Sequence, residues 1–413
     1  MKRSFLILLL CVALLATLSF AKTKIVYWQY FYETKIQTVD QVIKEFERLT
    51  PDIEVEHVNF PYENFNQKVA ASVPAGIGPD VVNLFYGWIP KYVTSGYLQP
   101  LPEVEFSKEY FAENFFPFVG PGVAYEGKSY ALPIAVRSLA LIWNKDLFEA
   151  AGLDPETPPV TLNELVAYAK KLTVYDRAGN IVQAGLTMQP SGQGHQWIRE
   201  VLIRQFGGVP YSNDGKMVMY DKTGAGPDVL KFYTDLIVKD NISYPGFMND
   251  DVTAFSSQKA AMTIDGSFRI GTLKNVKGLN FAFTELPSHN GVKSNFASFW
   301  ANGITKNATG DRLTAAIKFI KFLSSEYVMD LWLKNVGELP ANPALASKYY
   351  DDPTYGPFLK GLEYAHATFF VDETAQRQVI MDAVDKVING YSPQAAWKEM
   401  AAEEQKILDK FWK

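Results

Sequence analysis

Aromatic side chains that follow predicted strands are the residues of this sequence best suited to binding chemistry. Trp28, Tyr30 and Tyr32 follow a first β-rich run, and Tyr86 and Trp88 follow a third. The ends of strands in an open α/β sheet border the crevice in which ligands bind. Rings at this place can cover the apolar face of a sugar, while polar side chains bind its hydroxyl groups. Packing in the core is the alternative role for each ring.

Several rings must act together to hold a sugar. One ring contributes about 1 kcal/mol by covering apolar surface, whereas micromolar capture needs about 8 kcal/mol. Aromatic residues make up 14% of the chain, enough to supply both a core and a binding surface. The sequence therefore predicts a sugar site that combines several rings with hydrogen bonds.

A secreted glycoside hydrolase is the main alternative function. That chemistry needs two carboxylates roughly 5–9 Å apart, and the sequence leaves such an Asp/Glu pair open. The four histidines are far apart in sequence and show no metal-binding spacing. Gly76-Ile77-Gly78 lacks the third glycine of a dinucleotide loop and precedes a strand instead of following one. We therefore expect a binding protein, not an enzyme, with no cofactor and no metal.

Charge and cysteine content exclude several kinds of partner and site. The formal net charge is −5 and no run of basic residues occurs, so we expect no nucleic-acid partner and no binding to anionic membranes. The single cysteine, Cys11, lies in the apolar N-terminal segment. The rest of the chain therefore has no disulfide, thiolate nucleophile or cysteine metal site.

The N-terminal segment has the three parts of a secretory signal peptide. Lys2 and Arg3 precede an uncharged apolar run over 5–18, and Ser19 and Ala21 put small residues at the cleavage positions. The run is too short to span a bilayer. Leucines precede Cys11, which disfavours lipid attachment. We expect residues 1–21 to be a signal peptide cleaved after Ala21, and the mature protein to be periplasmic.

The elements that must position the candidate residues begin with a β-α-β-α-β pattern. Short β-rich runs occur at 25–28, at 53–55 and at 81–85. Thr38 and Gln41 have the spacing of a capping box and predict a helix start between the first two runs. Alternation of strands and helices is typical of a mostly parallel sheet covered by helices.

The pattern returns in the second half of the chain. Residues 139–143 and 262–264 are predicted strands, and Thr161 with Glu164 forms another capping box. From Asp311 the chain is predicted to be helical to its end, with one interruption near 337–343. No low-complexity tract or Gly/Ser linker occurs. Two α/β lobes joined by short crossings fit this organisation.

Segments spread over most of the chain carry a family resemblance. The most specific are 130–136 with 142–148, similar to a "Y-LP…YNKDLF" pattern, and 255–262 with 265–268, similar to "F-GKAAM…GSW". The supporting segments are 46–48 with 53–55, 78–82, 95–101 and 318–323. In this order they resemble the bacterial extracellular solute-binding proteins (family 1) of carbohydrate ABC importers, which are related to the maltodextrin-binding proteins.

The resemblance implies the two-lobe periplasmic-binding-protein fold, in which each lobe is a mostly parallel sheet flanked by helices. The ligand cleft would lie between the lobes, beside hinge crossings near 136–138, 295–297 and 323–325. The first lobe would contain 22–136 and 297–323, and the second 137–296 and 324–413. A monomer of this family would capture a carbohydrate, close around it and dock transiently on the membrane permease of an ABC importer.

The resemblance also adds candidate ligand-binding residues. Arg137 would lie at the first crossing, where maltodextrin-binding relatives carry an acidic residue that contacts the sugar. Asp265 and Phe268 would lie at a strand-to-helix turn, with phenylalanine in place of the family's stacking tryptophan. Trp300 would follow the second crossing, and Glu338 would lie in a late loop that reaches the cleft.

Two alternatives stay open at these positions. Arg137 can bind hydroxyls or a carboxylate through two parallel hydrogen bonds, or form a structural ion pair at the hinge. An anionic small solute, such as a uronide or a polyol phosphate, is therefore the alternative ligand. Gln193, His195 and Trp197 follow a glycine-bearing loop, although His195 also suits a surface or capping role and Trp197 can pack its own helix.

Overall fold

The computed structural model describes residues 22–224 and 226–413, so the predicted signal peptide lies outside the described residues. The strands are β1 (Thr23–Tyr30), β2 (Ile53–Phe60), β3 (Val81–Phe85), β4 (Ala124–Tyr125), β5 (Lys128–Ser129), β6 (Ala131–Asn144), β7 (Val174–Tyr175), β8 (Ile181–Gln183), β9 (Met262–Gly266), β10 (Phe281–Thr284), β11 (Asn295–Ile304) and β12 (Ala365–His366). The α-helices are α2 (Glu33–Leu49), α3 (Tyr62–Ser72), α4 (Ile89–Thr94), α5 (Lys108–Asn114), α6 (Val119–Val123), α7 (Lys145–Ala150), α8 (Leu162–Leu172), α9 (Ile203–Gln205), α10 (Asp228–Val238), α11 (Asp251–Ser256), α12 (Ile270–Lys274), α13 (Asp311–Leu323), α14 (Glu326–Val336), α15 (Pro343–Ala346), α16 (Gly356–Leu362), α17 (Glu373–Ile388) and α18 (Pro393–Trp412). Short 3-10 or π turns are η1 (Tyr86–Trp88), η2 (Pro190–Gly194), η3 (Trp197–Leu202), η4 (Ser267–Arg269) and η5 (Ser347–Tyr349).

One mixed sheet runs through the whole molecule. Its strand order is β10-β6-β11-β3-β1-β2, with β12 beside β11 and β9 beside β6. β1 pairs in parallel with β2 and β3, as the β-α-β-α-β pattern predicts. β11 runs antiparallel to both β3 and β6, and β6 runs antiparallel to β9 and β10. The α/β fold is confirmed, but the sheet is mixed where the sequence predicts mostly parallel pairing.

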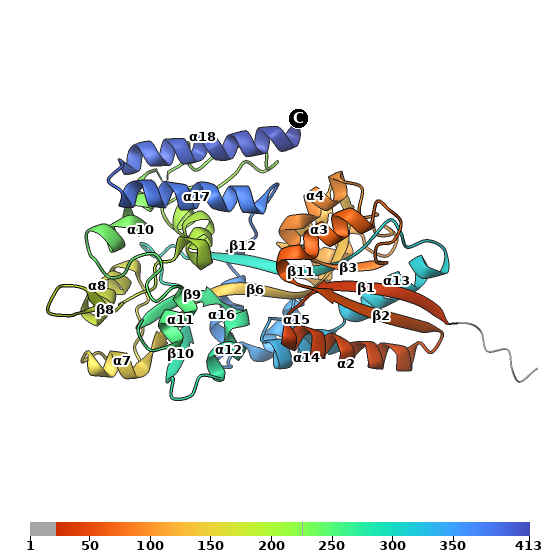
Figure 1. Ribbon diagram of the computed structural model, residues 1–413, viewed down its shortest axis with the longest axis horizontal. Coiled ribbons are helices and arrows are strands. Elements are labelled where there is room, and N and C mark those ends of the chain that lie inside the picture. Colours follow the sequence, from red (N-terminus) through yellow and green to blue (C-terminus); the bar gives the residue numbers. More distant parts are fainter. Residues whose placement is uncertain (1–21, 225) are drawn as a thin grey trace, which may run out of the picture.

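Strand β6 connects the two halves of the molecule (Figure 1). Its 14 residues are almost all buried, as expected for a continuous apolar run that is covered on both faces. From Ala131 to Ser138 it pairs with β11, and from Leu139 onward it pairs with β9 and β10. Both long strands therefore pass between the halves where Ser138 lies opposite Ala297.

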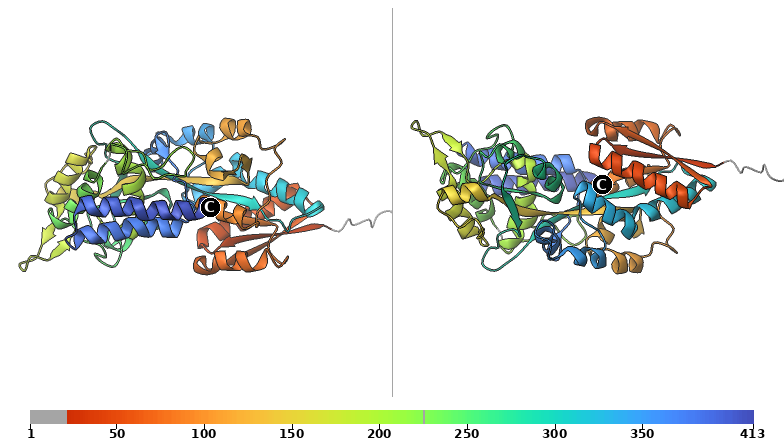
Figure 2. Two further views of the ribbon diagram at one scale, coloured as in Figure 1. Left: turned by 90° about the horizontal axis from the view of Figure 1, so that it is seen from above. Right: turned by 90° about the horizontal axis from the view of Figure 1, so that it is seen from below.

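Two hydrophobic cores hold the molecule, one centred on each half, and the first also reaches into the second half at Phe255 and Phe283. The first core contains Phe46, Phe319 and Trp332, among others, and the second contains Trp197 and Trp397. Helices α17 and α18 lie side by side over the second half, and α2 and α14 lie together on the first (Figures 1 and 2). This two-lobe architecture agrees with the fold class expected from the resemblance.

Residues after α13 pack differently from the expected division into lobes. The resemblance implies that 324–413 belongs to the second lobe, yet α14 packs against α2 and its Trp332 lies in the first core. Phe358 and Phe370 also belong to the first core, and the second core resumes at Val371. The apolar face of α14 is therefore covered by the first half. The other lobe boundaries stay a prediction.

Two capping boxes were expected and one of them forms. Thr161 accepts a hydrogen bond from the Glu164 amide, and the Glu164 carboxylate accepts one from the Thr161 amide, so the start of α8 is as predicted. The prediction at Thr38 is wrong, because α2 begins at Glu33. The Thr38 hydroxyl lies inside the helix and donates to the Thr34 carbonyl oxygen at 2.7 Å.

Among the described residues, none of the helices combines the length and the hydropathy that crossing a bilayer requires.

Candidate functional site

Arg137 lies where β6 passes between the two halves. Pairing of β6 with β11 places Ser298 opposite Arg137 and Trp300 opposite Ala135. Side chains two residues apart along a strand point to the same face of the sheet. Arg137 and Trp300 therefore share one face, at the junction of the lobes.

A single buried carboxylate, that of Glu338, binds two cations on this face. Its Oε1 accepts a hydrogen bond from Arg137 Nε at 2.6 Å and lies 2.9 Å from Lys35 Nζ. Its Oε2 accepts one from Trp332 Nε1 at 2.7 Å. The Glu338 side chain is fully buried and that of Lys35 is 2% exposed, whereas Arg137 is 17% exposed. We call Lys35, Glu338 and Arg137 the ion triad.

Backbone geometry brings Glu338 to this position. Gly337 ends α14 in the left-handed conformation, with φ 81°, which glycine adopts without strain. The next residues turn back toward β6, where Leu339 and Val136 exchange two backbone hydrogen bonds of 2.8 and 2.9 Å. Glu338 is thus held against the crossing strand, in agreement with the expectation that this late loop reaches the junction.

Four aromatic rings surround the Lys35 ammonium. Its Nζ lies 4.9 Å from the ring centroid of Trp300 and 5.1 Å from that of Tyr30. Trp332 and Tyr32 follow at 5.7 and 5.9 Å. Cation–π attraction at these distances offsets part of the cost of burying the ammonium.

Burial and neighbouring charges set the protonation of the ion triad. Burial lowers the pKa of Lys35 to about 7, because Glu338 offsets only part of the desolvation and Arg137 adds repulsion. Burial alone would raise the pKa of Glu338, but Arg137 and Lys35 outweigh it and lower that pKa to about 2. Glu338 is therefore a carboxylate near neutral pH, while Lys35 titrates there.

The second lobe supplies an aromatic ring and an ion pair next to Arg137. The Arg137 guanidinium carbon lies 4.6 Å from the ring centroid of Phe268, and that of Arg269 lies 4.9 Å from it. Arg269 Nε donates to Asp265 Oδ2 at 2.8 Å. Burial raises the pKa of Asp265, and Arg269 partly offsets this effect. Asp265 and Phe268 thus face the ion triad from β9 and η4.

An aromatic group continues from the ion triad along the first lobe. Tyr30 and Trp300 have ring centroids 4.4 Å apart, and Trp88 meets Trp300 edge-on at 5.5 Å. Tyr62 contacts Tyr30 at 5.4 Å and Trp88 at 5.9 Å. Trp300 is buried, Trp88 is half-buried and Tyr62 is exposed. The outer rings are therefore the accessible ones.

The structure thus brings together most of the expected site residues, and it adds others. The expected residues that lie together at the junction are Tyr30, Tyr32, Trp88, Arg137, Asp265, Phe268, Trp300 and Glu338. Lys35, Tyr62 and Trp332 were missed. Tyr62 follows β2 as Tyr30 ends β1, so the same rule that selected Tyr30 applies to it. No pattern in the neighbouring sequence marks Lys35 as a site residue, because its partner Glu338 comes from a distant loop.

The remaining expected residues lie elsewhere or make other contacts. Trp28 packs edge-on against Phe60 within the first core. Trp197 packs in the second core against Tyr233. His195 is buried, with Nδ1 2.9 Å from the Gly192 carbonyl oxygen, and burial lowers its pKa well below the usual value. Gln193 is half-buried in η2.

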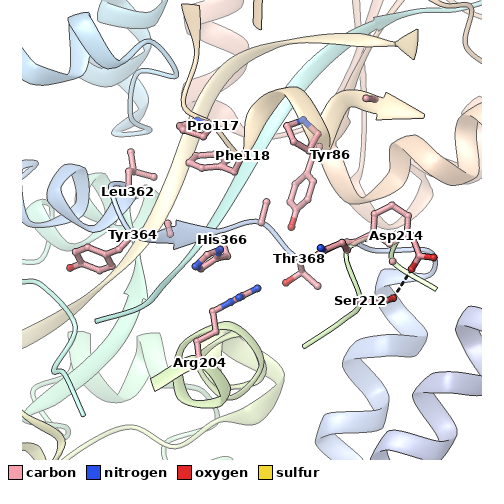
Figure 3. Close-up of a pocket in the computed structure, with 18 of the residues that line it drawn as sticks. Tyr86, Pro117, Phe118, Arg204, Ser212, Asp214, Leu362, Tyr364, His366 and Thr368 are labelled. Carbon is pink, nitrogen blue, oxygen red and sulfur yellow. Dashed lines mark hydrogen bonds between the residues drawn. The ribbon is translucent and has the colours of Figure 1, made fainter. Parts of the chain in front are cut away.

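Tyr86 borders a separate cavity of about 640 Å³ between the lobes (Figure 3). Arg204 and His366 point toward each other at this cavity, and the Tyr86 hydroxyl points into it beside Thr368. Tyr86 stacks on Phe299 at 4.7 Å. Because neighbouring side chains alternate along a strand, the cavity and Trp300 lie on opposite faces of β11. The cavity is therefore distinct from the ion triad.

Comparison with known proteins assigns the chain to one protein family. Residues 41–357 match the model of a family described as bacterial extracellular solute-binding protein. The maltotriose-binding protein of Pyrococcus abyssi (strain GE5 / Orsay) is 23% identical over 339 residues, which cover 81% of this chain and 66% of that protein. The sn-glycerol-3-phosphate-binding periplasmic protein of Salmonella typhimurium (strain LT2) is 25% identical, covering 78% of this chain and 75% of that protein.

A solved structure extends the similarity over nearly the whole chain. It is an ABC transporter solute-binding protein from Thermotoga lettingae bound with α-D-tagatose. The TM-score is 0.78 at 25% sequence identity, and the alignment covers 94% of this chain and all of the other.

Proposed function

Because the chain belongs to the bacterial extracellular solute-binding protein family, we propose that it captures a sugar or oligosaccharide between its two lobes and delivers it to an ABC importer. Family members act outside the cytoplasm, and the relatives named above are binding proteins. We further propose that the protein is exported with cleavage after Ala21, works as a monomer and docks transiently on permease subunits.

The observation that carries the ligand site is the meeting of accessible rings and fixed charges at the junction of the lobes. Trp88 and Tyr62 offer apolar surface on the first lobe, while Phe268 and the Asp265–Arg269 pair face it from the second. A site of this kind suits a molecule with apolar faces and a polar rim. Closure of the lobes around a bound ligand is the expected motion.

Trp88 suits a sugar platform better than Trp300 does. Trp300 is 4% exposed, and its ring already contacts Tyr30 and the Lys35 ammonium. Trp88 is half-buried: Phe85 and Trp300 meet it edge-on, and Tyr92 stacks with it at a ring-centroid distance of 6.5 Å. We therefore assign Trp300 to the support of the site and Trp88 to direct contact with the ligand.

Trp88→Ala is expected to weaken sugar binding roughly 10- to 100-fold, since it removes a large apolar contact worth about 1–3 kcal/mol. Isothermal titration with maltodextrins and a panel of disaccharides measures the change. Trp412→Ala is the matched control, because Trp412 is also half-buried but packs against Phe369 near the C-terminus. Normal binding by the Trp88 variant, with a lower melting temperature, would place this ring in the core and contradict its assignment.

Incubation with oligosaccharides separates this function from glycoside hydrolysis. A binding protein returns every oligosaccharide at its original length, which chromatography of the reaction mixture detects. Shortened products that appear with the purified protein, and disappear when Asp265 is replaced by asparagine, would instead assign it to the hydrolases. This outcome would make the junction a catalytic centre with Asp265 as one of its carboxylates.

A further inference from the structure

We propose that the ligand site at the junction prefers a sugar that carries one carboxylate group, because Arg137 and Lys35 share a single buried carboxylate. This inference rests on the proposed function and specifies the chemical class of its ligand. It concerns the face of β6 that carries Arg137, and not the cavity on the opposite face of the sheet.

The ion triad carries more positive than negative charge. Arg137 and Lys35 both bind Oε1 of Glu338, whose other oxygen accepts from the neutral Trp332 indole. The nearest ions of the second lobe, Asp265 and Arg269, are paired with each other. The carboxylates of Asp250 and Asp251 lie beside that pair, and neither is among the charges that act most on Arg137 or Lys35. A protonated Lys35 therefore leaves an excess of one positive charge at the junction. Buried charge without an equal partner is costly, so an added anion is favoured there.

Only one member of the ion triad is open to a ligand. Arg137 is 17% exposed, while Lys35 and Glu338 are 2% and 0% exposed. The Arg137 guanidinium also faces Phe268 of the second lobe, so it lies where the two lobes meet. A sugar carboxylate that reaches Arg137 would make a charge-assisted hydrogen bond. Its pyranose ring would then lie beside the outer rings of the aromatic group.

Binding of such an anion is expected to be coupled to the protonation of Lys35. The titratable and charged groups that face its ammonium are Glu338 from the late loop, Arg137 from β6, Tyr30 from β1 and Tyr32, which directly precedes α2. A carboxylate next to Arg137 offsets the repulsion between the two cations, and so raises the pKa of Lys35 above its unliganded value of about 7. Affinity should therefore be greatest below pH 7 and should fall as the pH rises above it.

The four rings around Lys35 provide the opposing explanation. Cation–π contacts can stabilise the ammonium without any anion, and deprotonation of Lys35 would leave a neutral Arg137–Glu338 pair. In that case the junction would have no preference for acidic sugars. The two explanations differ in ligand selectivity and in the number of protons taken up on binding.

Calorimetric titration of the full mature chain distinguishes them. The probes are uronic-acid disaccharides of galacturonate and glucuronate, each paired with its neutral galactose or glucose counterpart. At pH 6 we expect at least one acidic disaccharide to bind about tenfold or more tightly than its neutral counterpart. Between pH 7 and 8.5 its affinity should fall by up to about tenfold per pH unit, because one proton is taken up. Titration at pH 8 in buffers of different ionisation enthalpy counts that proton directly.

Two substitutions test the role of Lys35 as a positioning residue. Lys35→Met removes the excess charge, so the preference for the acidic sugar and its pH dependence should both disappear. Lys35→Arg keeps the charge at every pH used, so the preference should remain while the pH dependence is lost. Circular dichroism checks that each variant is folded, and the pH profile of the wild-type protein tests the inference even where a variant does not fold.

The outcomes separate this inference from the proposed function. Equal or tighter binding of neutral sugars, with no proton uptake, overturns the inference and leaves the proposed function in place. Failure of every sugar in the panel, neutral or acidic, contradicts the proposed function itself.

Discussion

Glu338→Gln is expected to lower the free energy of unfolding by about 3–5 kcal/mol, as the loss of one partner from a buried ion pair generally does. The substitution leaves Arg137 and Lys35 next to each other with no anion between them. The amide can still accept the Trp332 indole hydrogen bond, so the loss reports mainly on charge. Chemical denaturation followed by circular dichroism measures the change.

Glu326→Gln is the control for this experiment. Glu326 lies at the start of α14, the helix that precedes Glu338, but its carboxylate is 61% exposed and lies 3.7 Å from Lys348. Exposed pairs of this kind contribute little to stability, so this variant should unfold almost as the wild-type protein does. Equal effects of the two substitutions would contradict the role that we assign to the ion triad.

The same carboxylate should make the protein sensitive to acid. The pKa of Glu338 is lowered to about 2 in the folded protein, from an ordinary value of 4.5. An unfolded chain therefore binds this proton at a higher pH than the folded chain does. The stabilisation is complete above pH 4.5 and is lost as the pH falls toward 2. Glu338→Gln should lack this part of the acid transition.

Glu404→Gln is expected to destabilise the second lobe by a similar amount, about 3–5 kcal/mol. Glu404 Oε1 accepts from Arg199 Nη2 at 2.9 Å, and Oε2 accepts from the Tyr220 hydroxyl at 2.8 Å. Both Arg199 and Glu404 are fully buried. Without the carboxylate, the guanidinium keeps the Gln376 carbonyl oxygen as its hydrogen-bond acceptor and only the weaker charge interaction with Glu200.

The adjacent residue on the same helix provides a matched control. Glu403 lies on α18 and is 50% exposed, paired with Lys406. Glu403→Gln should leave the denaturation midpoint nearly unchanged, whereas Glu404→Gln should shift it strongly. A small effect of Glu404→Gln, measured by the same denaturation experiment, would contradict the role that we assign to this buried ion pair.

Local sequence patterns predicted elements well where a pattern needs only neighbouring residues. The capping box of Thr161 and Glu164 forms because both partners lie within one helical turn. The Thr38 pattern failed because α2 extends one and a half turns further toward its N-terminus, where Lys35 is fixed by the ion triad. Tertiary contacts decided that boundary, and the capping pattern alone could not.

The candidate site shows the same limit. Arg137 and Glu338 are 201 positions apart in sequence, so no spacing rule connects them. The resemblance placed both near the junction, but it did not indicate that they bind each other or that Lys35 joins them. The expectation that aromatic residues after strands bind the ligand selected the correct segments, but it could not tell toward which face of the sheet each ring points. Tyr86 and Trp88 lie in one short turn, yet Tyr86 borders the cavity and Trp88 joins the aromatic group.

The passage of β6 through both halves has a consequence for folding. Successive residues of this one strand belong to different cores, with Ala140 and Ile142 in the first and Leu139 and Leu141 in the second. Loss of packing in either core therefore frees backbone that the other core needs. Heat should unfold the protein in a single cooperative step, with equal calorimetric and van't Hoff enthalpies. The partners of β6 in β11 come from a distant part of the chain, so this step should also be slow to reverse.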